Sequence, residues 1–496
     1  AVNLPAAQVI DGQQRLTTLT ILLSAISSLQ AGEDAQDFRS YVNEPGRRSE
    51  GLAAKPRLRL RPRDADFFKD YVQDFRFDDL CKLDHGKLTD VQYNIKINSS
   101  RVFDKLKQAF GDDRDAIFQF GKFVVNNCYL VAVSTPSMES AYRVFSVLND
   151  RGLDLLTSDI LKAELIGRIP EGARDSYTNN WEAVEEELGR EAFKDLFGHV
   201  RMIYQKDKAR KTVLEEFREH VLSIEKDPQR FIDQRLIPYA QSYKDILEVS
   251  YESSKYAEEI NGLLTWLNRI DNTDWIPPLL QFMRWDSPSP EALLQFIRKL
   301  ERLAGTMFVR GLYSNDRIAR YAKVIDSIEN DTLDSSNSSL DLGAEDKRQT
   351  LLAASGDVYR MSKRPRTYLL LRLDSFVSDK AAVYDQKRLT VEHVLPQTVS
   401  GEGAWYWEKH WPDIDERDQW VHKLGNLVLL SRNKNSGAQN YDFPKKKEQY
   451  FYSRSGVSSY VITTKVLAKN DWTPTIVKHQ QDELIAELKK GWQLKV

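Results

Sequence analysis

Two short apolar runs near the carboxy-terminal end constrain the fold of this chain more than any other feature. Residues 389–395 predict a short strand that carries Glu392 and His393 side by side near its end. Residues 424–430 predict a glycine turn that enters a second strand, and residues 431–435 predict the start of a helix. The sequence therefore predicts a strand, a second strand and a helix in this order, with polar side chains where they meet.

The polar residues of this stretch have the chemistry that phosphodiester hydrolysis requires. Such hydrolysis needs a base that deprotonates water and a cation that neutralises charge on the phosphate. An imidazole such as that of His393 has an ordinary pKa of about 6.5, so it is mostly neutral at physiological pH. A carboxylate and an amide oxygen, both present in this stretch, form a hard site that favours Mg²⁺ or Mn²⁺. The alternative is a structural turn that carries its Asn residues by coincidence.

Positive charge gathers around this stretch. Residues 421–454 contain seven Lys and Arg and two acidic residues, which gives a local net charge of +5. The seven are Lys423, Arg432, Lys434, Lys445, Lys446, Lys447 and Arg454. Such a cluster is often only a solvated face, but next to the predicted site it indicates a surface that meets DNA phosphates.

A second polar turn lies at the beginning of the chain, where an apolar step at residues 9–10 runs into leucines at helical spacing from residue 16. The turn consists of Asp11, Gly12, Gln13, Gln14 and Arg15. A helix amino terminus presents unpaired N–H groups and a positive dipole to an anion, and a guanidinium can grip a phosphate bidentately. The alternative from physics alone is a capped helix without a ligand. The turn lacks the glycine and lysine pattern of a Walker loop.

The rest of the chain predicts mostly helices. Period-2 alternation over residues 57–61 and branched residues over 124–133 predict two strands. The predicted helices cover residues 137–148 (capped by Gly152), 157–166, most of 175–328, 368–376 and 477–492. Residues 330–343 are rich in Ser, Asp and Asn and predict an exposed loop near a domain boundary.

Composition excludes several classes of protein. The 496 residues carry 71 Lys and Arg against 73 Asp and Glu, a net charge of −2, which excludes a histone-like polycation. No apolar run approaches the roughly 20 residues that span a bilayer, so we expect no membrane partner. Two cysteines, Cys81 and Cys128, support neither a disulfide framework nor a thiolate zinc site, so we expect a cytoplasmic location.

The carboxy-terminal stretch resembles the ββα-metal, or HNH, nuclease fold. Glu392, His393, Asn426 and Asn435 match its motif in order. The resemblance implies that His393 is the general base and that Glu392 and Asn435 hold one divalent metal. It also implies that Asn426 braces the loop that orients His393. The assignment of Asn435 leaves the neighbouring Asn433 open as the ligand.

The amino-terminal motif, together with residues 145–155 and 159–163, resembles the DGQQR-type ParB/sulfiredoxin-like domain of modification-dependent restriction enzymes. Both motif sets in this order resemble GmrSD-like fusions, a group that includes defence effectors linked to DNA phosphorothioation. The resemblance implies binding and hydrolysis of an NTP, GTP or ATP, at residues 11–15. Members carry a segment before this motif, so we expect further residues before Ala1 in the natural protein.

We therefore expect an α+β, mostly α chain with three parts: a ParB-like NTP-binding domain over 1–170, a helical region over 171–345 and an HNH-like nuclease domain over 346–496. The expected function is that of a nucleotide-regulated DNA endonuclease or nickase of anti-phage defence. Its expected partners are double-stranded DNA, modified or from phage, and a nucleotide, with a homo-oligomer possible. The alternative is a ParB-like regulatory protein that binds DNA under nucleotide control and whose HNH-like domain is structural.

Overall fold

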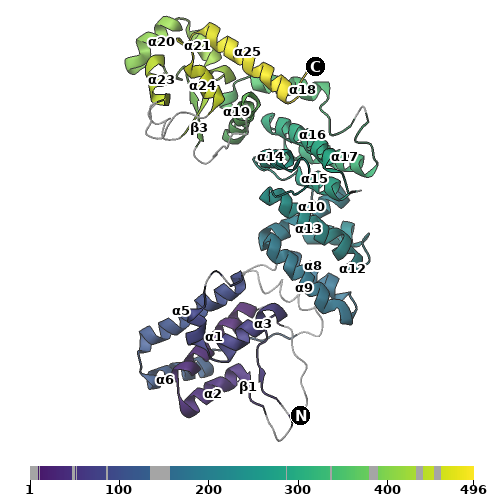
Figure 1. Ribbon diagram of the computed structural model, residues 1–496, viewed down its shortest axis with the longest axis vertical. Coiled ribbons are helices and arrows are strands. Elements are labelled where there is room, and N and C mark those ends of the chain that lie inside the picture. The colour runs from purple at the N-terminus through teal and green to yellow at the C-terminus, as the bar shows by residue number, and fades with distance from the viewer. Residues whose placement is uncertain are drawn as a thin grey trace. The chain divides into compact units, whose positions relative to one another are not determined.

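The computed structural model of this chain divides into two compact units, Ala1–Asp154 and Leu155–Val496. The residues that the structure describes are 9, 12–46, 51, 53–84, 86, 88–134, 157–285, 287–335, 338–378, 389–431, 440–451 and 460–495. Within them, helices dominate both units, and the two sheets found are pairs of short antiparallel strands (Figure 1). The prediction of an α+β, mostly α chain is confirmed.

The amino-terminal unit is a helical cluster built around the first predicted helix. Its elements are α1 (Gln13–Leu29), α2 (Gly32–Val42), β1 (Asn43–Glu44), β2 (Lys55–Pro56), α3 (Pro62–Phe68), the π-helical η2 (Lys69–Gln73), α4 (Phe77–Lys82), α5 (Asp90–Phe110) and α6 (Arg114–Asn127). From α1, Ile21, Ala25 and Ile26 enter a core shared with Phe38 of α2 and Phe103 of α5. This spacing buries one stripe of α1, and the helix predicted from residue 16 onward is confirmed.

Both strands predicted in this unit are wrong. Residues 57–61 follow β2 as an irregular segment, because β1 offers only two residues for pairing. Leu58 and Leu60 nevertheless pack on the core, as their alternation predicts. Residues 124–127 belong to α6, since Ile117, Gly121 and Val125 recur at helical spacing against the same core, and residues 128–134 are irregular and exposed.

The second unit begins with a long run of helices. They are α8 (Thr157–Gly167), α9 (Glu171–Leu188), α10 (Arg190–Gln205), α11 (Val213–Glu216), η4 (Phe217–Leu222), α12 (Pro228–Phe231), η5 (Ile232–Leu236), α13 (Ile237–Glu248), α14 (Ala257–Leu267), α15 (Ile276–Arg284), α16 (Pro290–Val309) and α17 (Ser314–Glu329). The helix predicted over 157–166 and the helical region predicted over 175–328 are confirmed.

The same unit continues into a mixed carboxy-terminal part. Its elements are α18 (Ala344–Ser355), the 3-10 turn η6 (Val358–Arg360), α19 (Lys363–Val377), β3 (Leu389–His393), η8 (Gly401–Gly403), α20 (Ala404–His410), α21 (Ile414–Trp420), the 3-10 turn η9 (Leu424–Asn426), β4 (Leu427–Ser431), α23 (Phe443–Phe451), α24 (Val461–Leu467) and α25 (Pro474–Gly491). The helices predicted over 368–376 and 477–492 are confirmed as α19 and α25. So are the two predicted strands, β3 and β4.

One hydrophobic core runs through both parts of this unit. Leu303 of α16, Leu370 of α19 and Trp492 after α25 belong to the same cluster. The loop predicted as exposed contributes too, because Leu340 and Leu342 are buried in this cluster, so that prediction is wrong at these two residues. The predicted boundaries at residues 170 and 345 stay a prediction.

Several predicted features lie outside the described residues. They are Asp11, the helix predicted after Pro136, the motif at 145–155, and Asn433 and Asn435 with the helix start predicted at 431–435. None of the helices that the structure describes combines the length and the apolar character needed to span a bilayer.

Close packing of α25 on the η9 turn predicts a specific sensitivity at Gly425. The backbone N–H of Gly425 donates to Gln481 Oε1 at 2.7 Å, and a methyl group added at Gly425 would lie 2.6 Å from the carbonyl oxygen of Val477. We expect Gly425→Ala to lower the unfolding free energy by about 1–3 kcal/mol, the usual cost of overpacking. Urea titration followed by tryptophan fluorescence measures this.

The matched control is Gly262→Ala on α14, where an added methyl group meets no atom within 4 Å. This change should stabilise the helix by up to about 1 kcal/mol, the difference in helix propensity between Ala and Gly. Equal unfolding midpoints for Gly425→Ala and the wild type would contradict the packing of α25 on η9.

Candidate functional site

The β3–β4 pair separates two hydrophobic cores and sorts the candidate residues between its faces. In the register, His393 lies opposite Leu427 and Glu392 lies opposite Val428. Leu427 belongs to the core shared with the helical region, and Val428 belongs to a second core that holds Trp407, Trp411 and Trp472. Because successive side chains of a strand point to opposite faces, His393 and Glu392 lie on opposite faces of the sheet. The two residues are neighbours in sequence that face different surroundings.

His393 is packed among aromatic rings. His393 is only 3% exposed, and its ring centroid is 4.0 Å from that of Tyr359 in η6. Its Nε2 is 3.3 Å from Nδ1 of His422, which is partly exposed. The Tyr359 N–H donates to the His422 carbonyl oxygen at 3.1 Å, so η6 holds both histidines in place. His422 therefore connects the buried imidazole to the surface.

Burial and nearby cations keep His393 neutral. Burial, together with smaller contributions from the neighbouring His422, Lys446 and Arg366, lowers the pKa of His393 to about 3. The pKa of His422 is lowered too, mainly by burial. Both imidazoles are thus uncharged at physiological pH, as a proton acceptor must be, although a pKa of about 3 makes His393 a weak base in the free protein.

On the other face, Glu392 meets a fully buried lysine. Lys446 of α23 places its Nζ 3.5 Å from Glu392 Oε1 and donates to the carbonyl oxygen of His393 at 2.7 Å. Burial raises the pKa of Glu392, while Lys446 opposes this rise. Burial also lowers the pKa of Lys446 to about 8, partly offset by Glu392. The strand end thus carries a desolvated acid and a desolvated base in contact.

Asn426 fastens the loop that follows β3. Its Oδ1 accepts from the Leu395 N–H at 2.8 Å and from Trp472 Nε1 at 3.0 Å. Its Nδ2 donates to the carbonyl oxygens of Leu395 at 3.0 Å and Val421 at 2.8 Å. The amide is buried with all four hydrogen bonds made, and it ties the segment after His393 to the turn before β4. This is the geometry of a loop brace, the role that the resemblance implies for Asn426.

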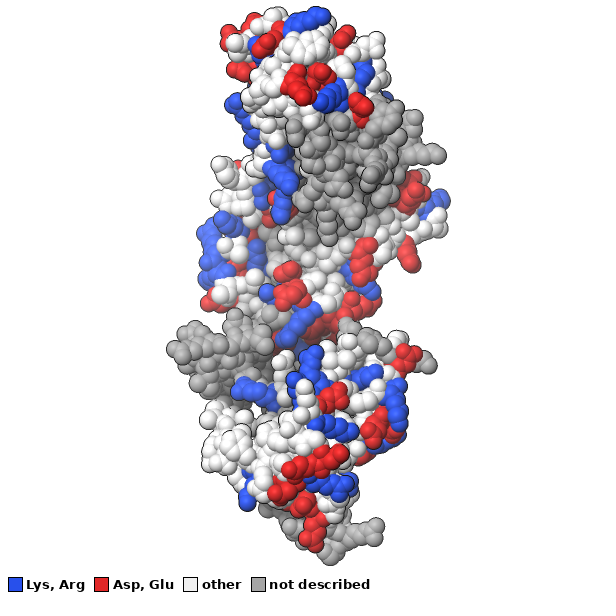
Figure 2. Space-filling view, turned by 90° about the vertical axis from the view of Figure 1, so that its left-hand side faces the viewer, with Lys and Arg blue, Asp and Glu red and all other residues white. Residues whose placement is uncertain are grey.

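The four described members of the predicted basic patch are engaged within the protein. Lys446 is buried, Lys423 pairs with Asp357 at 3.3 Å, and Lys445 pairs with Glu402 at 2.8 Å. Lys447 donates to the carbonyl oxygen of Lys469 at 2.6 Å. The other three predicted members, Arg432, Lys434 and Arg454, lie outside the described residues. Figure 2 shows Lys and Arg interspersed with Asp and Glu over the described part of one face, in line with the near-zero net charge.

A metal site would rest here on Glu392. Among the described residues, no group of three or more His, Cys, Asp or Glu gathers as a metal site would need. The predicted second ligand, Asn435, lies outside them. The raised pKa of Glu392 shows that its negative charge is only partly compensated, and a nearby cation would relieve this. The described residues thus supply one hard oxygen ligand of the predicted set.

The amino-terminal motif forms an open helix start. Gly12 precedes α1 with φ at +86°, a conformation that favours glycine, and no acidic residue lies in the first turn. Gln13, Gln14 and Arg15 are exposed. The Arg15 guanidinium folds back over the turn, 3.8 Å from where a Gly12 side chain would begin. An exposed helix start with a guanidinium above it has the features of an anion site.

Sequence reasoning missed three groups that the fold brings to the carboxy-terminal site. His422 and Tyr359 have no motif spacing relative to His393, and only packing places them there. Lys446 was predicted as a surface charge. The helical spacing within 443–447 could have indicated the burial of Lys446, because Phe443 and Lys446 are three residues apart and share the buried face of α23.

The Glu392–Lys446 pair predicts a stability effect with a defined pH window. Lys446→Met leaves a buried carboxylate without its cation, so we expect a loss of about 3–5 kcal/mol in unfolding free energy at pH 7. The double variant Lys446→Met/Glu392→Gln should recover part of that loss. Lys445→Met, which removes a neighbouring exposed charge, is the control and should leave the stability nearly unchanged.

The pH dependence follows from the lowered pKa of Lys446. Between pH 8 and 10.5 the unfolded chain binds more protons at this group than the folded chain, so its contribution makes stability rise with pH. Urea titrations across this window, followed by the fluorescence of the buried Trp407, Trp411 and Trp472, should show that rise in the wild type and not in Lys446→Met. An identical pH slope in both proteins would contradict the buried pair.

Two family descriptions match this chain. The family described as GmrSD restriction endonuclease, N-terminal domain, matches residues 3–166. The family described as GmrSD restriction endonucleases, C-terminal domain, matches residues 345–487, which contain both strands of the candidate site. Among curated proteins, none matches the chain. The two domains occur in the order that the motifs predict and together cover more than half of the sequence, and the chain belongs to the GmrSD-like family of restriction endonucleases.

Proposed function

We propose that this restriction endonuclease hydrolyses DNA phosphodiesters with a divalent metal at the end of β3, under the control of a nucleotide bound at the start of α1. The family supports the coarser statement, a DNA endonuclease role in restriction. The observation that carries the metal-dependent step is the Glu392–Lys446 pair beside His393, since desolvated ionisable groups with displaced pKa values gather at functional sites. Modified or phage DNA is the proposed substrate.

In this proposal His393 accepts the proton of the attacking water. The His422 ring in contact with its Nε2 can then pass that proton to the surface, because His422 is partly exposed. A phosphate brought next to His393 would raise the pKa of this histidine, since a negative charge favours the protonated imidazole. Asn426 acts as a positioning residue through the loop that it braces.

Glu392 and Asn435 would hold the Mg²⁺ or Mn²⁺ ion. When bound, such an ion polarises the phosphate and stabilises charge on the leaving oxygen. Lys446, in contact with Glu392 Oε1, opposes the effect of burial on the pKa of this carboxyl group and so favours the ionised form that a metal ligand requires. Its buried ammonium also adds positive charge beside the reacting phosphate.

The amino-terminal helix is proposed to bind the phosphates of GTP or ATP. The exposed N–H groups at the start of α1 and the Arg15 guanidinium provide the positive potential, and the Gly12 turn lets a compact anion approach the backbone. Asp11 would contact a metal, a water or a ribose hydroxyl. Control of cleavage requires that the nucleotide bind one conformation of the protein better than another.

One observation favours a second candidate function. His393 is almost fully buried, and its low pKa suits a packed structural imidazole as well as a base. The second candidate is therefore a ParB-like protein that binds DNA under nucleotide control and whose HNH-like domain is structural. Cleavage assays separate the two candidates.

Cleavage of supercoiled plasmid with Mg²⁺, on modified and unmodified DNA, tests the catalytic assignment. We expect His393→Ala to lower the cleavage rate by about 100-fold or more, the usual contribution of a general base. Glu392→Gln should shift the Mg²⁺ titration to higher concentration without weakening DNA binding. His422→Ala should give an intermediate loss.

His479→Ala is the matched control, because His479 is an exposed histidine of α25 paired with Glu483. Its cleavage rate should equal that of the wild type. Wild-type cleavage by His393→Ala, with a melting temperature like that of the wild type, would rule out the base and favour the structural alternative. If His422→Ala lost cleavage while His393→Ala kept it, His422 would be the general base instead.

The nucleotide site is tested at Arg15. We expect Arg15→Ala to abolish NTP binding and hydrolysis, while cleavage that needs no nucleotide continues, because Arg15 lies in the amino-terminal unit. Arg101→Ala, an exposed arginine of α5, is the control. If Arg15→Ala hydrolyses NTP normally but shows a DNA affinity whose log–log salt slope falls by about one, Arg15 grips DNA phosphates instead.

A further inference from the structure

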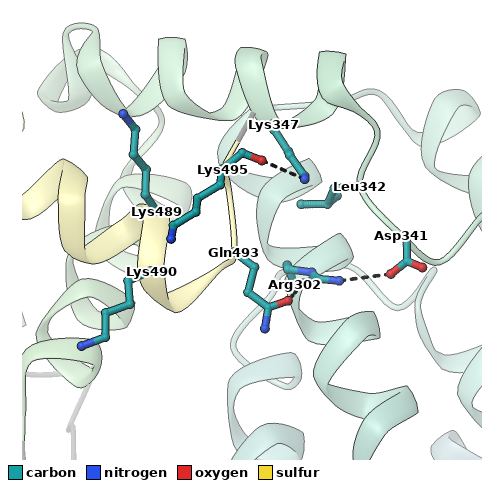
Figure 3. Close-up of a pocket in the computed structure, with 8 residues that line it drawn as sticks. All are labelled: Arg302, Asp341, Leu342, Lys347, Lys489, Lys490, Gln493 and Lys495. Atoms are coloured by element: carbon teal, nitrogen blue, oxygen red, sulfur yellow. Dashed lines mark hydrogen bonds and ion pairs between the residues drawn. The ribbon is translucent and has the colours of Figure 1, made fainter.

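A basic cavity lies where α16, α18 and the end of α25 meet. Its volume is about 510 Å³, and its lining includes five cationic side chains and a single acidic one (Figure 3). They are Arg302, Lys347, Lys489, Lys490, Lys495 and Asp341. The chain as a whole carries a net charge of −2, so this concentration of positive charge is local. The cavity lies apart from the β3–β4 site and belongs to neither site proposed above.

Most of this positive charge has no counter-charge among the described residues. Asp341 pairs with Arg302 at 3.2 Å and with Lys299 at 3.1 Å, so the one acidic group is already shared between two cations. In the described part of the chain, Lys347, Lys489, Lys490 and Lys495 form no ion pair. Lys347 instead donates to the carbonyl oxygen of Lys495 at 2.9 Å. Lys489 and Lys490 at the end of α25 also stabilise the helix dipole, but that explains neither Lys347 nor Lys495.

The cavity wall is held in place by packing. After α25, Trp492 and Leu494 are buried in the main core, which anchors the segment that carries Lys495. Between them, Gln493 has φ at +52°, an unusual conformation for a residue other than glycine, and its Oε1 accepts from Arg302. Arg302 lies between Gln493 and Asp341, as Figure 3 shows, and among the described groups none accepts its Nε donor. The wall is thus fixed by Trp492, Leu494 and Arg302, while Lys489, Lys490 and Lys495 are exposed at a cavity that is open to solvent.

We infer that this cavity binds phosphate groups, from either a nucleoside polyphosphate or the DNA backbone. Several cations that line one cavity, four of them with no ion pair among the described residues, match a ligand that carries several negative charges. Arg and Lys are the side chains that bind phosphate. A volume of 510 Å³ lies in the range of about 300–1,000 Å³ typical of small-molecule sites.

The test measures binding of inorganic tripolyphosphate by calorimetry and of a short DNA duplex by fluorescence anisotropy over a salt series. The cavity variant is Lys489→Gln/Lys495→Gln in the full chain. The matched control is Lys409→Gln/Lys478→Gln, which removes the same charge from exposed positions on α20 and α25. Both pairs are also made in the Arg15→Ala background, so that an anion bound at α1 is not counted. Melting temperatures confirm that each variant folds.

We expect the cavity variant to bind tripolyphosphate about tenfold more weakly than the control variant does. An unchanged duplex affinity would then identify a nucleoside polyphosphate as the source of the phosphate. A duplex affinity that also falls, with a log–log salt slope smaller by about two, would identify the DNA backbone. Equal affinities of cavity and control variants for both probes, or no binding of either probe, would overturn the proposal.

Discussion

The carboxy-terminal candidate site depends on the antiparallel pairing of β3 with β4, which positions Glu392 and His393. Each strand has five residues; one face of both strands packs in the core of the helical region, and the other face of β4 packs in a core of tryptophans. A slip of one residue in the register would exchange the surroundings of Glu392 and His393. Burial of one face of β3 and of both faces of β4 specifies the register, and Asn426 ties the loop after His393 to the turn before β4.

Burying the charged groups of Glu392 and Lys446 beside this sheet costs desolvation free energy, and this cost is relevant to the function of the two residues. An apolar pair of similar volume in place of Glu392 and Lys446 would often be as stable or more so. Burial raises the pKa of the carboxyl group and lowers that of the ammonium, so the folded protein disfavours charge on each partner. A phosphate and a metal ion would bring charges of both signs to this place. The arrangement is better suited to a charged substrate than to the free protein.

Helix α25 contacts two regions of different chemistry. Its first half packs on η9, where Gln481 accepts from the Gly425 N–H next to Asn426. Its last turn carries Lys489 and Lys490 on the wall of the basic cavity. One helix thus supports the turn that braces the candidate nuclease site and the cavity proposed to bind phosphate. The nucleotide site proposed at the start of α1 differs from this cavity, because it would use backbone N–H groups rather than lysines.

The sequence by itself determined the helices and the two strands of the site. The apolar spacing of residues 16–26, 157–166, 368–376 and 477–492 follows the period of a helix, and all four are helices in the structure. A helix can be predicted from the spacing of its apolar residues because its hydrogen bonds are local. The predictions of strands at 57–61 and 124–133 are wrong. A strand needs a partner strand, and the residue pattern of one segment does not reveal whether such a partner exists.

Only the tertiary structure decided what surrounds each candidate residue. The motif identified Glu392, His393 and Asn426, yet the contact of His393 with His422 and Tyr359 joins residues about 30 positions apart with no shared pattern. Lys446 counts as one more surface charge in the sequence and is fully buried in the fold. The basic cavity likewise joins residues from 302 to 495. The choice of partners depends on long-range packing, which local residue patterns do not encode.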